Sequence, residues 1–287
     1  KVWNAWKGRL LEDLYRYALR ALGGARPNLQ AEVEARKQEA LGRLALQSAL
    51  PGTEEPLWKT LDVRYFVRHD AGDIAWHARS LWRHLDAAEP VVRVRPSPVG
   101  EGLQVMVFAP DRPDLFARIC GYFDGAAFSV LDAKVHTTAA GYALDTFQII
   151  NPHLASQMPA AYRDFISLVE TQLGQALMSQ GALPEPSRGR VSRRVRSFPV
   201  TPRVSLTPDE RGQRWLLTVS SSDRTGLLYG IARVLARNGI NLQLAKISTL
   251  GERVEDTFLV DGPLLQHERA QLRVESELLD VLAPPGS

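Results

Sequence analysis

The stretch that decides the fold is Ser220–Val260, which reads SSSDRTGLLYGIARVLARNGINLQLAKISTLGERVEDTFLV. A turn at Asp223–Gly226 follows an apolar strand, and apolar residues then recur at the spacing of an amphipathic helix. Asn238-Gly239 ends that helix, because glycine adopts a left-handed conformation at little cost. Alternating residues follow in Asn241–Thr249 and again in Val254–Val260. The pattern predicts strand, helix, strand, strand.

The same pattern occurs earlier in the chain, after a turn at Asp111. The two turns lie 223 − 111 = 112 residues apart, and one residue of slip later aligns the Asp-Thr-Phe of 145–147 with that of 256–258. The pairs aligned at 112 are Leu115 and Leu227, Ile119 and Ile231, Lys134 and Lys246, and Thr137 and Thr249. The chain therefore contains an internal duplication.

Each copy begins before its turn strand, because Pro96 and Pro208 also lie 112 residues apart. The second copy ends in a predicted helix, Leu264–Leu282, with five residues after it and no room for a last strand. We expect the leading strands, within Val91–Pro98 and Arg203–Pro208, to take that place at the sheet edge. The predicted order is ββαββα in each copy.

Both copies resemble the ACT domain, a small α+β regulatory module that binds ligands. The D-R-x-G-L-L turn, the N-G-I-N run and the D-T-F strand carry the resemblance in the second copy. The first copy departs from it, with Asp114 in place of the turn glycine and Ala126-Ala127 in place of Asn-Gly. The fold class expected is α+β: an all-helical N-terminal segment and two tandem ACT domains of the ferredoxin-like βαββαβ type.

Composition is ordinary for a globular protein. The 287 residues are 45% hydrophobic and 23% charged, and the formal net charge is +3. Acidic residues are mixed among the basic ones, which argues against a nucleic-acid partner. No apolar run reaches the ~20 residues of a membrane span. The single Cys120 falls on an apolar helix face, is read as a core residue, and agrees with a reducing, cytoplasmic compartment.

The N-terminal third is predicted to be helical. Residues 1–22 form an amphipathic pattern, and Asn28 is a candidate N-cap for a helix to about Ser48. Asp70 is read as the cap of a helix over Ala71–Leu85, with Trp82 among its buried residues. The domains expected are a helical segment (1–90), a first ACT domain (91–183), a basic linker (184–202) and a second ACT domain (203–287).

The runs W-N-A-W-K at 3–7, Y-F-V-R-H at 65–69 and I-A-W-H at 74–77, followed by two ACT modules, resemble the C-terminal part of one family. This is the bifunctional uridylyltransferase/uridylyl-removing enzyme of bacterial nitrogen signalling. The resemblance implies that the parent protein attaches UMP to a PII-type signal protein and removes it, that Mg²⁺ serves the parent enzyme, and that the ACT pair senses glutamine. Residues 1–22 would be the tail of the hydrolase domain.

The chain itself lacks both sets of catalytic motifs. No Gly-Ser turn with a D-x-D pair occurs, and no phosphate-binding loop. His69-Asp70 spells the metal-binding dipeptide of HD hydrolases, but Asp70 is better explained as a helix cap. His77 and His84 lie seven residues apart on one helix, roughly 10 Å by helical rise, too far to share an ion. We expect no catalytic residues, metal or cofactor in this chain.

The two turns are the candidate ligand sites, because a helix N-terminus favours a carboxylate. In this hypothesis Asp223 binds an amino group, Gly226 admits a ligand to the backbone, and Asn241 or the facing copy assists. The alternative is a structural cap and packing role. The residues in question are Asp223, Arg224, Thr225, Gly226, Leu227 and Asn241 in the second copy, and Asp111, Arg112 and Asp114 in the first.

Alternatives to glutamine sensing remain at this stage. The ACT pair could serve only for protein interaction, with a dimer formed through the ACT sheets. The chain could instead be the regulatory half of a guanosine-tetraphosphate synthetase/hydrolase. The arginines of the linker fit a solvated segment or a docking patch for an acidic surface; they are Arg188, Arg190, Arg193, Arg194 and Arg196.

Overall fold

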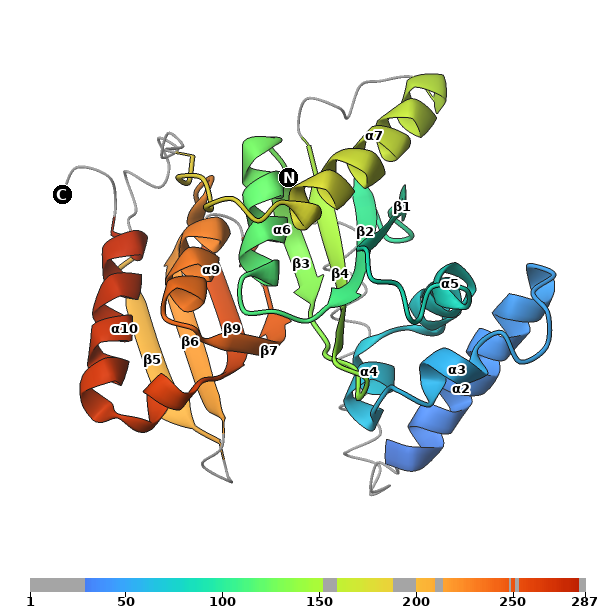
Figure 1. Cartoon of the computed structure of the whole chain (residues 1–287), viewed down its shortest axis with the longest axis horizontal. Coiled ribbons are helices and arrows are strands. Elements are labelled where there is room, and N and C mark those ends of the chain that lie inside the picture. The colour runs from blue at the N-terminus through green and yellow to red at the C-terminus, as the bar shows by residue number, and fades with distance from the viewer. Residues whose placement is uncertain are drawn as a thin grey trace.

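In the computed structural model, the two copies of the repeat lie side by side, and a group of helices precedes the first (Figure 1). The structure describes residues 29–151, 159–187, 200–209, 214–247, 249–250 and 253–283. The helix expected over residues 1–22, its W-N-A-W-K run and the five linker arginines lie outside these residues.

The helical segment consists of α2 (Leu29–Leu46), α3 (Glu55–Trp58), α4 (Val63–Arg68) and α5 (Ala71–Leu81). The Asp70 carboxylate accepts a hydrogen bond from the Asp73 amide at 2.9 Å, so its predicted role as N-cap is confirmed. Asp62 caps α4 in the same way, through the Tyr65 amide at 3.2 Å.

The prediction for the end of α5 was wrong. The helix stops at Leu81 rather than Leu85, and Trp82 is 39% exposed instead of buried. The chain turns there toward the first strand, and the His84 amide donates to the Leu81 carbonyl at 2.7 Å. The guanidinium of Arg83 covers the Trp82 ring at 4.0 Å, in place of core residues.

Each copy contributes strands to one antiparallel sheet and helices to one of its faces. The elements of the first copy are β1 (Val91–Pro96), β2 (Leu103–Pro110), α6 (Leu115–Gly125), β3 (Ser129–Lys134), β4 (Tyr142–Ile150) and α7 (Pro159–Met178). Those of the second are β5 (Arg203–Pro208), β6 (Trp215–Ser222), α9 (Leu227–Arg237), β7 (Asn241–Lys246), β8 (Thr249–Leu250), β9 (Arg253–Asp261), the 3₁₀ turn η1 (Pro263–Gln266) and α10 (Glu268–Leu282).

The duplication predicted from the sequence is confirmed element by element. The bounds of β1, β2, α6 and β3 recur 112 residues later as those of β5, β6, α9 and β7. β4 recurs as β9 at an offset of 111, which is the predicted slip of one residue. The strand order is β1-β2-β4-β3-β7-β9-β6-β5, with β8 pairing β9 off this path. The leading strands β1 and β5 therefore form the two sheet edges, as predicted.

The two faces of the sheet are covered differently. All helices of the two copies pack on one face, where buried residues of both copies form a single core. On the opposite face, helices α2–α5 cover the first copy through Met106, Phe108 and Leu144. Across the second copy that face carries exposed residues, among them Leu216, which is 40% exposed.

Both edge strands are closed by a carboxylate from an outer helix. The amide of Val94 in β1 donates to Glu170 of α7 at 2.7 Å. The amide of Leu206 in β5 donates to Glu275 of α10 at 3.1 Å. An edge strand otherwise presents unpaired N–H groups to another chain. The same device at both edges satisfies one of these groups in each copy.

Removal of the Glu170 carboxylate tests this device. In Glu170→Ala the buried Val94 amide loses a charged acceptor, and we expect the free energy of unfolding to fall by about 1.5–3 kcal/mol. Exchange of the Val94 amide with solvent should accelerate. Gln175→Ala, at an exposed position of the same helix, is the control. Urea denaturation and amide exchange provide the measurements, and equal stability of the two variants would contradict the assignment.

Candidate functional site

The arginines of the two turns hold the ends of the outer helices. Arg112 donates to the Leu177 carbonyl in the last turn of α7 at 2.6 Å. Arg224 donates to the Val281 carbonyl in the last turn of α10. Terminal carbonyls of a helix have no partner within the helix. The repeated contact therefore gives Arg112 and Arg224 a structural role, whatever else the turns bind.

The two turns differ at the position of the helix cap. Gly226 has a left-handed backbone with φ +80°, whereas Asp114 has φ −96° and ψ −1°. Asp114 is also engaged by two cations, Arg118 at 2.6 Å and Arg112 at 3.1 Å. The first turn thus places a neutralised carboxylate where the second has a glycine.

The close approach expected at Gly226 exists, but the approaching backbone belongs to this chain. A Cβ atom at Gly226 would meet the Ser187 carbonyl oxygen at 2.7 Å and the Asp124 carboxylate at 3.3 Å. The Ser187 amide donates to Asp124 at 2.6 Å. The Tyr229 hydroxyl donates to the Pro184 carbonyl at 2.7 Å, so the segment 184–187 is tied across α6 and α9. Asp223 and Thr225 are exposed on the same turn, and Leu227 is buried.

Polar groups of the two copies meet at the seam, the line where β3 of the first copy pairs with β7 of the second through Lys134 and Lys246. The Asp111 carboxylate accepts a hydrogen bond from the Thr137 hydroxyl at 3.0 Å, and the nearby Asn241 side chain opposes the rise in its pKa that burial causes. Asp261, where the Gln243 side chain likewise opposes the effect of burial on the pKa, adds a second carboxylate. The structure thus places Asn241 against the turn of the facing copy.

The seam site, which we define as Asp111, Thr137, Asn241, Gln243 and Asp261, favours a cationic group. Burial raises the pKa of the Asp111 carboxyl, and the hydrogen bonds from Thr137 and Asn241 oppose that shift. Burial also raises the pKa of Asp261. A positive charge placed between the two carboxylates would relieve both shifts. The amide and hydroxyl groups beside them supply hydrogen bonds for a neutral polar ligand group.

Beneath the seam lies Asp145, the aspartate of the first D-T-F strand. Burial raises the pKa of its carboxyl well above the usual range, and the negative charge of Asp111 adds to the effect. The His136 amide donates to it at 3.4 Å, and the charge of Arg68 lowers its pKa. The pKa of this buried carboxyl therefore depends on the charge of Asp111 in the seam site and on the charge of Arg68 in the helical segment.

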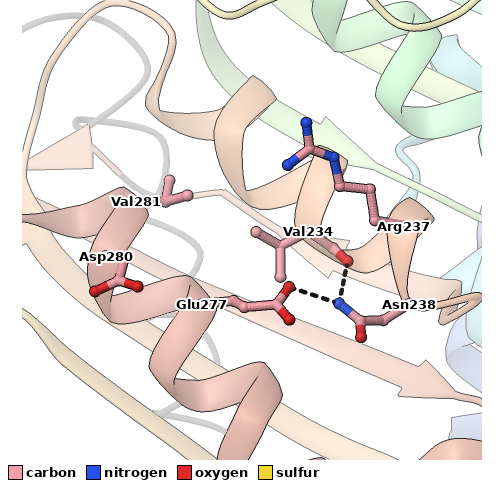
Figure 2. A pocket seen from close by; sticks show the side chains of 6 residues that line it. All are labelled: Val234, Arg237, Asn238, Glu277, Asp280 and Val281. Atoms are coloured by element: carbon pink, nitrogen blue, oxygen red, sulfur yellow. Dashed lines mark hydrogen bonds between the residues drawn. The ribbon is translucent and has the colours of Figure 1, made fainter.

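A second candidate is the open hollow of about 480 Å³ between α9 and α10 (Figure 2). Its lining residues are Val234, Arg237, Asn238, Glu277, Asp280 and Val281. The Asn238 side chain donates to the Val234 carbonyl at 3.0 Å and to Glu277 at 2.9 Å, as the dashed lines in Figure 2 show. The hollow lies beside the C-terminal end of α9, away from the turn at its start. The side-chain amide of Asn238 is already hydrogen-bonded within the protein, so the hollow offers a ligand fewer free polar groups than the seam does.

His69 and His77 of the helical segment belong to a buried network under the first copy. The Tyr65 hydroxyl lies 2.7 Å from His77 Nδ1, and His77 Nε2 lies 3.1 Å from the Thr146 hydroxyl. His69 bonds the Tyr65 carbonyl through Nδ1 at 2.9 Å and stacks on the Tyr65 ring. Within the described ranges, no group of three or more His, Cys, Asp or Glu could hold a metal ion. Within the same ranges, no helix is long and apolar enough to cross a membrane.

Asp73 anchors this network to the sheet. Its carboxylate accepts hydrogen bonds from Arg95 at 2.8 Å, Gln104 at 2.9 Å and Lys134 at 3.0 Å. Burial acts to raise the pKa of Asp73, but the charges of Lys134, His69 and His77 and the hydrogen bond from Lys134 together outweigh it and hold the pKa below the ordinary value. Burial lowers the pKa of His77 to about 3. The helical segment and the first copy are therefore joined by charges as well as by apolar contacts.

The sequence singled out Asp111 and Asn241 but did not bring them together. It missed Thr137, Gln243 and Asp261 as members of one site, since each looks like an ordinary strand or loop residue. The repeat itself was the signal that could have predicted this site. Each copy leaves one edge strand unpaired, and the equivalent strands β3 and β7 can pair with each other. Cys120 is buried in the core, as expected.

The fold and the seam define the class of protein: a regulatory region built from two paired ACT-type modules behind a small helical unit. Residues 215–276 match the ACT domain model, and residues 28–80 match the model described as Uridylyltransferase GlnD fifth domain. An aspartate kinase structure from Synechocystis shares only 16% identity at TM-score 0.35, over 63% of this chain and 27% of that one. That similarity is too weak to carry an argument.

Curated relatives match nearly the whole of this chain. The bifunctional uridylyltransferase/uridylyl-removing enzyme of Ralstonia nicotianae is 57% identical over 99% of this chain and 33% of its own length. That of Cupriavidus pinatubonensis is 56% identical over 98% of this chain and 32% of its own. The chain matches the C-terminal third of these bifunctional uridylyltransferase/uridylyl-removing enzymes, and the resemblance noted from the sequence is confirmed.

The buried state of His77 predicts a pH effect on stability. Its pKa is about 3 when folded and about 6.5 when unfolded, so stability is full above pH 6.5 and falls as the unfolded chain takes up a proton. Between pH 7 and pH 5 this histidine should cost about 2 kcal/mol of unfolding free energy. His77→Gln should remove that part of the pH dependence, as measured by urea denaturation at both values. His84→Gln, on a partly exposed histidine outside the network, should retain it.

Proposed function

We propose that this chain is the amino-acid sensing region of a bifunctional uridylyltransferase/uridylyl-removing enzyme and that glutamine is its ligand. One observation carries the proposal: the side chain of Asn241 in the second copy lies near enough to Asp111 of the first copy, across the seam, to oppose the rise that burial causes in the pKa of its carboxyl. A ligand bound there would contact both copies at once. Its binding would therefore depend on how the two modules are placed against each other, as a sensor requires.

The chemistry of the seam site suits glutamine. Its ammonium group would lie between the carboxylates of Asp111 and Asp261, whose pKa values are raised by burial. Its side-chain amide would bond the amide of Asn241 and the hydroxyl of Thr137. Glutamate carries a second negative charge, which the two aspartates would repel. The site would therefore distinguish the two amino acids by charge at nearly equal size.

The whole enzyme's activities enter as part of this proposal, because the chain spans about a third of the length of its relatives. The parent protein would add UMP to a PII-type signal protein and remove it, in the cytoplasm and with Mg²⁺ bound outside this chain. The residues described here would supply regulation. The match of residues 28–80 to a uridylyltransferase domain disfavours the guanosine-tetraphosphate alternative.

A pure interaction module is the remaining rival, and amino-acid binding separates the two. At a free glutamine concentration of about 100 times its dissociation constant, the ligand should add about 2.7 kcal/mol to the free energy of unfolding. The melting temperature should rise by about four degrees or more. Glutamate should raise it less. Calorimetry and thermal melts on the 287-residue chain provide the test.

Two variants locate the site. Asn241→Ala and Asp111→Asn should each weaken glutamine binding about tenfold or more, because each removes a charged or hydrogen-bonding partner. Asp280→Asn, an exposed aspartate in the hollow of Figure 2, is the matched control and should bind like the wild type. Binding lost in Asp280→Asn but retained in the seam variants would move the site to the hollow. No heat with millimolar glutamine would reject the sensor.

The chain should not catalyse either reaction. Because its sequence lacks a D-x-D pair after a Gly-Ser turn and any complete HD set, the purified chain should neither add UMP to a PII-type protein nor remove it. The assay follows UMP transfer with Mg²⁺ or Mn²⁺ at high protein concentration. Turnover above a control without the protein would contradict the expectation, and the full-length enzyme serves as the positive control.

A further inference from the structure

Arg68, the last residue of α4, touches both copies at the seam. One guanidinium nitrogen donates to the Val135 carbonyl, just after β3 of the first copy, at 3.0 Å. The other terminal nitrogen donates to the Ala245 carbonyl in β7 of the second copy. Val135 and Ala245 each adjoin a residue of the Lys134–Lys246 pair that joins the sheets. The planar fork of one arginine therefore spans the junction.

The guanidinium of Arg68 is half-buried and electrostatically tied to its surroundings. Burial lowers its pKa, and the charges of Asp132 and Asp145 oppose that shift. Asp145 in turn responds to Asp111 of the seam site. Because Arg68 is partly shielded from water, its hydrogen bonds at the seam are stronger than they would be in solvent, and their strength depends on nearby charges and on distance.

The other side of α4 is held by α2. Arg36 of α2 donates to the carbonyls of Phe66, at 2.8 Å, and Val67 in the last turn of α4. Its second terminal nitrogen bonds Glu32 at 2.9 Å. Helix α4 is six residues long, so its terminal carbonyls depend on partners outside it. The helix is fixed between the seam through Arg68 and α2 through Arg36.

We propose that Arg68 transmits occupancy of the seam site to helices α4 and α2. The inference rests on the proposed function, since the ligand it invokes is the amino acid bound between Asp111 and Asn241. A ligand held by both copies changes the distance between the carbonyls of Val135 and Ala245. Arg68 bonds both carbonyls only at one spacing, so α4 shifts when the spacing changes. Arg36 then carries the shift to α2, the described helix nearest the N-terminus.

The hollow of Figure 2 has its amide satisfied by neighbours, and the exposed face of the second copy has no observed partner chemistry. The buried histidines already belong to the joint between helices and sheet. Arg68 bonds both copies at the seam, and the helix that carries it is bonded in turn by Arg36 of α2.

Amide exchange of the 287-residue chain, with and without glutamine, tests the proposal. In the wild type, glutamine should change the exchange rates in residues 29–46 and 63–68 by about threefold or more, besides those at the seam. In Arg68→Met, glutamine should still give heat in calorimetry, while the change in α2 and α4 is lost. Without ligand, Arg68→Met should speed exchange in both β7 and α4 by about tenfold, since two hydrogen bonds to a charged group are gone.

Two variants serve as controls. Arg64→Met removes an exposed arginine of the same helix, paired only loosely with Asp62 at 3.7 Å, and should behave like the wild type. Arg68→Lys keeps the charge but lacks the fork, so it should fold and show a reduced response in α2 and α4. It also keeps the test valid should Arg68→Met fold poorly.

The outcomes separate the two proposals. Absence of glutamine heat in the wild type overturns the proposed function and the ligand-dependent part of this inference with it. Heat without an exchange change in α2 and α4 overturns this inference alone. An unchanged response in well-folded Arg68→Met likewise assigns transmission to another contact.

Discussion

Lys134 and Lys246 face each other where the sheets of the two copies join, and this junction depends on neutralisation of their positive charges. Like charges directly opposite each other destabilise a pair of strands. Lys134 is neutralised by Asp73, a buried carboxylate that arrives from α5 on the far side of the sheet. The helical segment thus supplies the charge that lets the copies meet. The bond between Asp73 and Lys134 thus adds a charged contact to the apolar packing of helices α2–α5 on the first copy.

Most of the fold could be predicted from the sequence, because the repeat fixes the elements twice. The offset of 112, its slip in the hairpin and the edge position of the leading strands depend on local pattern, and all agree with the structure. The end of α5 could not be predicted in this way. The pattern continues past Leu81, but the connection to β1 turns Trp82 away from the core.

The candidate site was harder to predict, because it forms only when the two copies dock. The sequence pointed to Asp111 and Asn241 as members of different sites, and docking brings them together across the seam. Gly226 was expected to admit a ligand to the backbone, whereas Ser187 of the same chain makes the close approach there. Register between copies is a tertiary property, which propensity and spacing along the chain do not encode.

The duplicated halves keep their structural contacts and differ in their polar ones. Arg112 and Arg224 hold equivalent helix ends, whereas Gly226 stands opposite Asp114 in the alignment and Asn241 opposite Ser129. The carboxylates at the edges, Glu170 and Glu275, are among the features kept. Because they occupy amides that an added strand would need, further chains cannot lengthen the sheet without displacing them. Larger assemblies of this region would then grow through helices or the uncovered sheet face, and the regulatory unit stays finite in width.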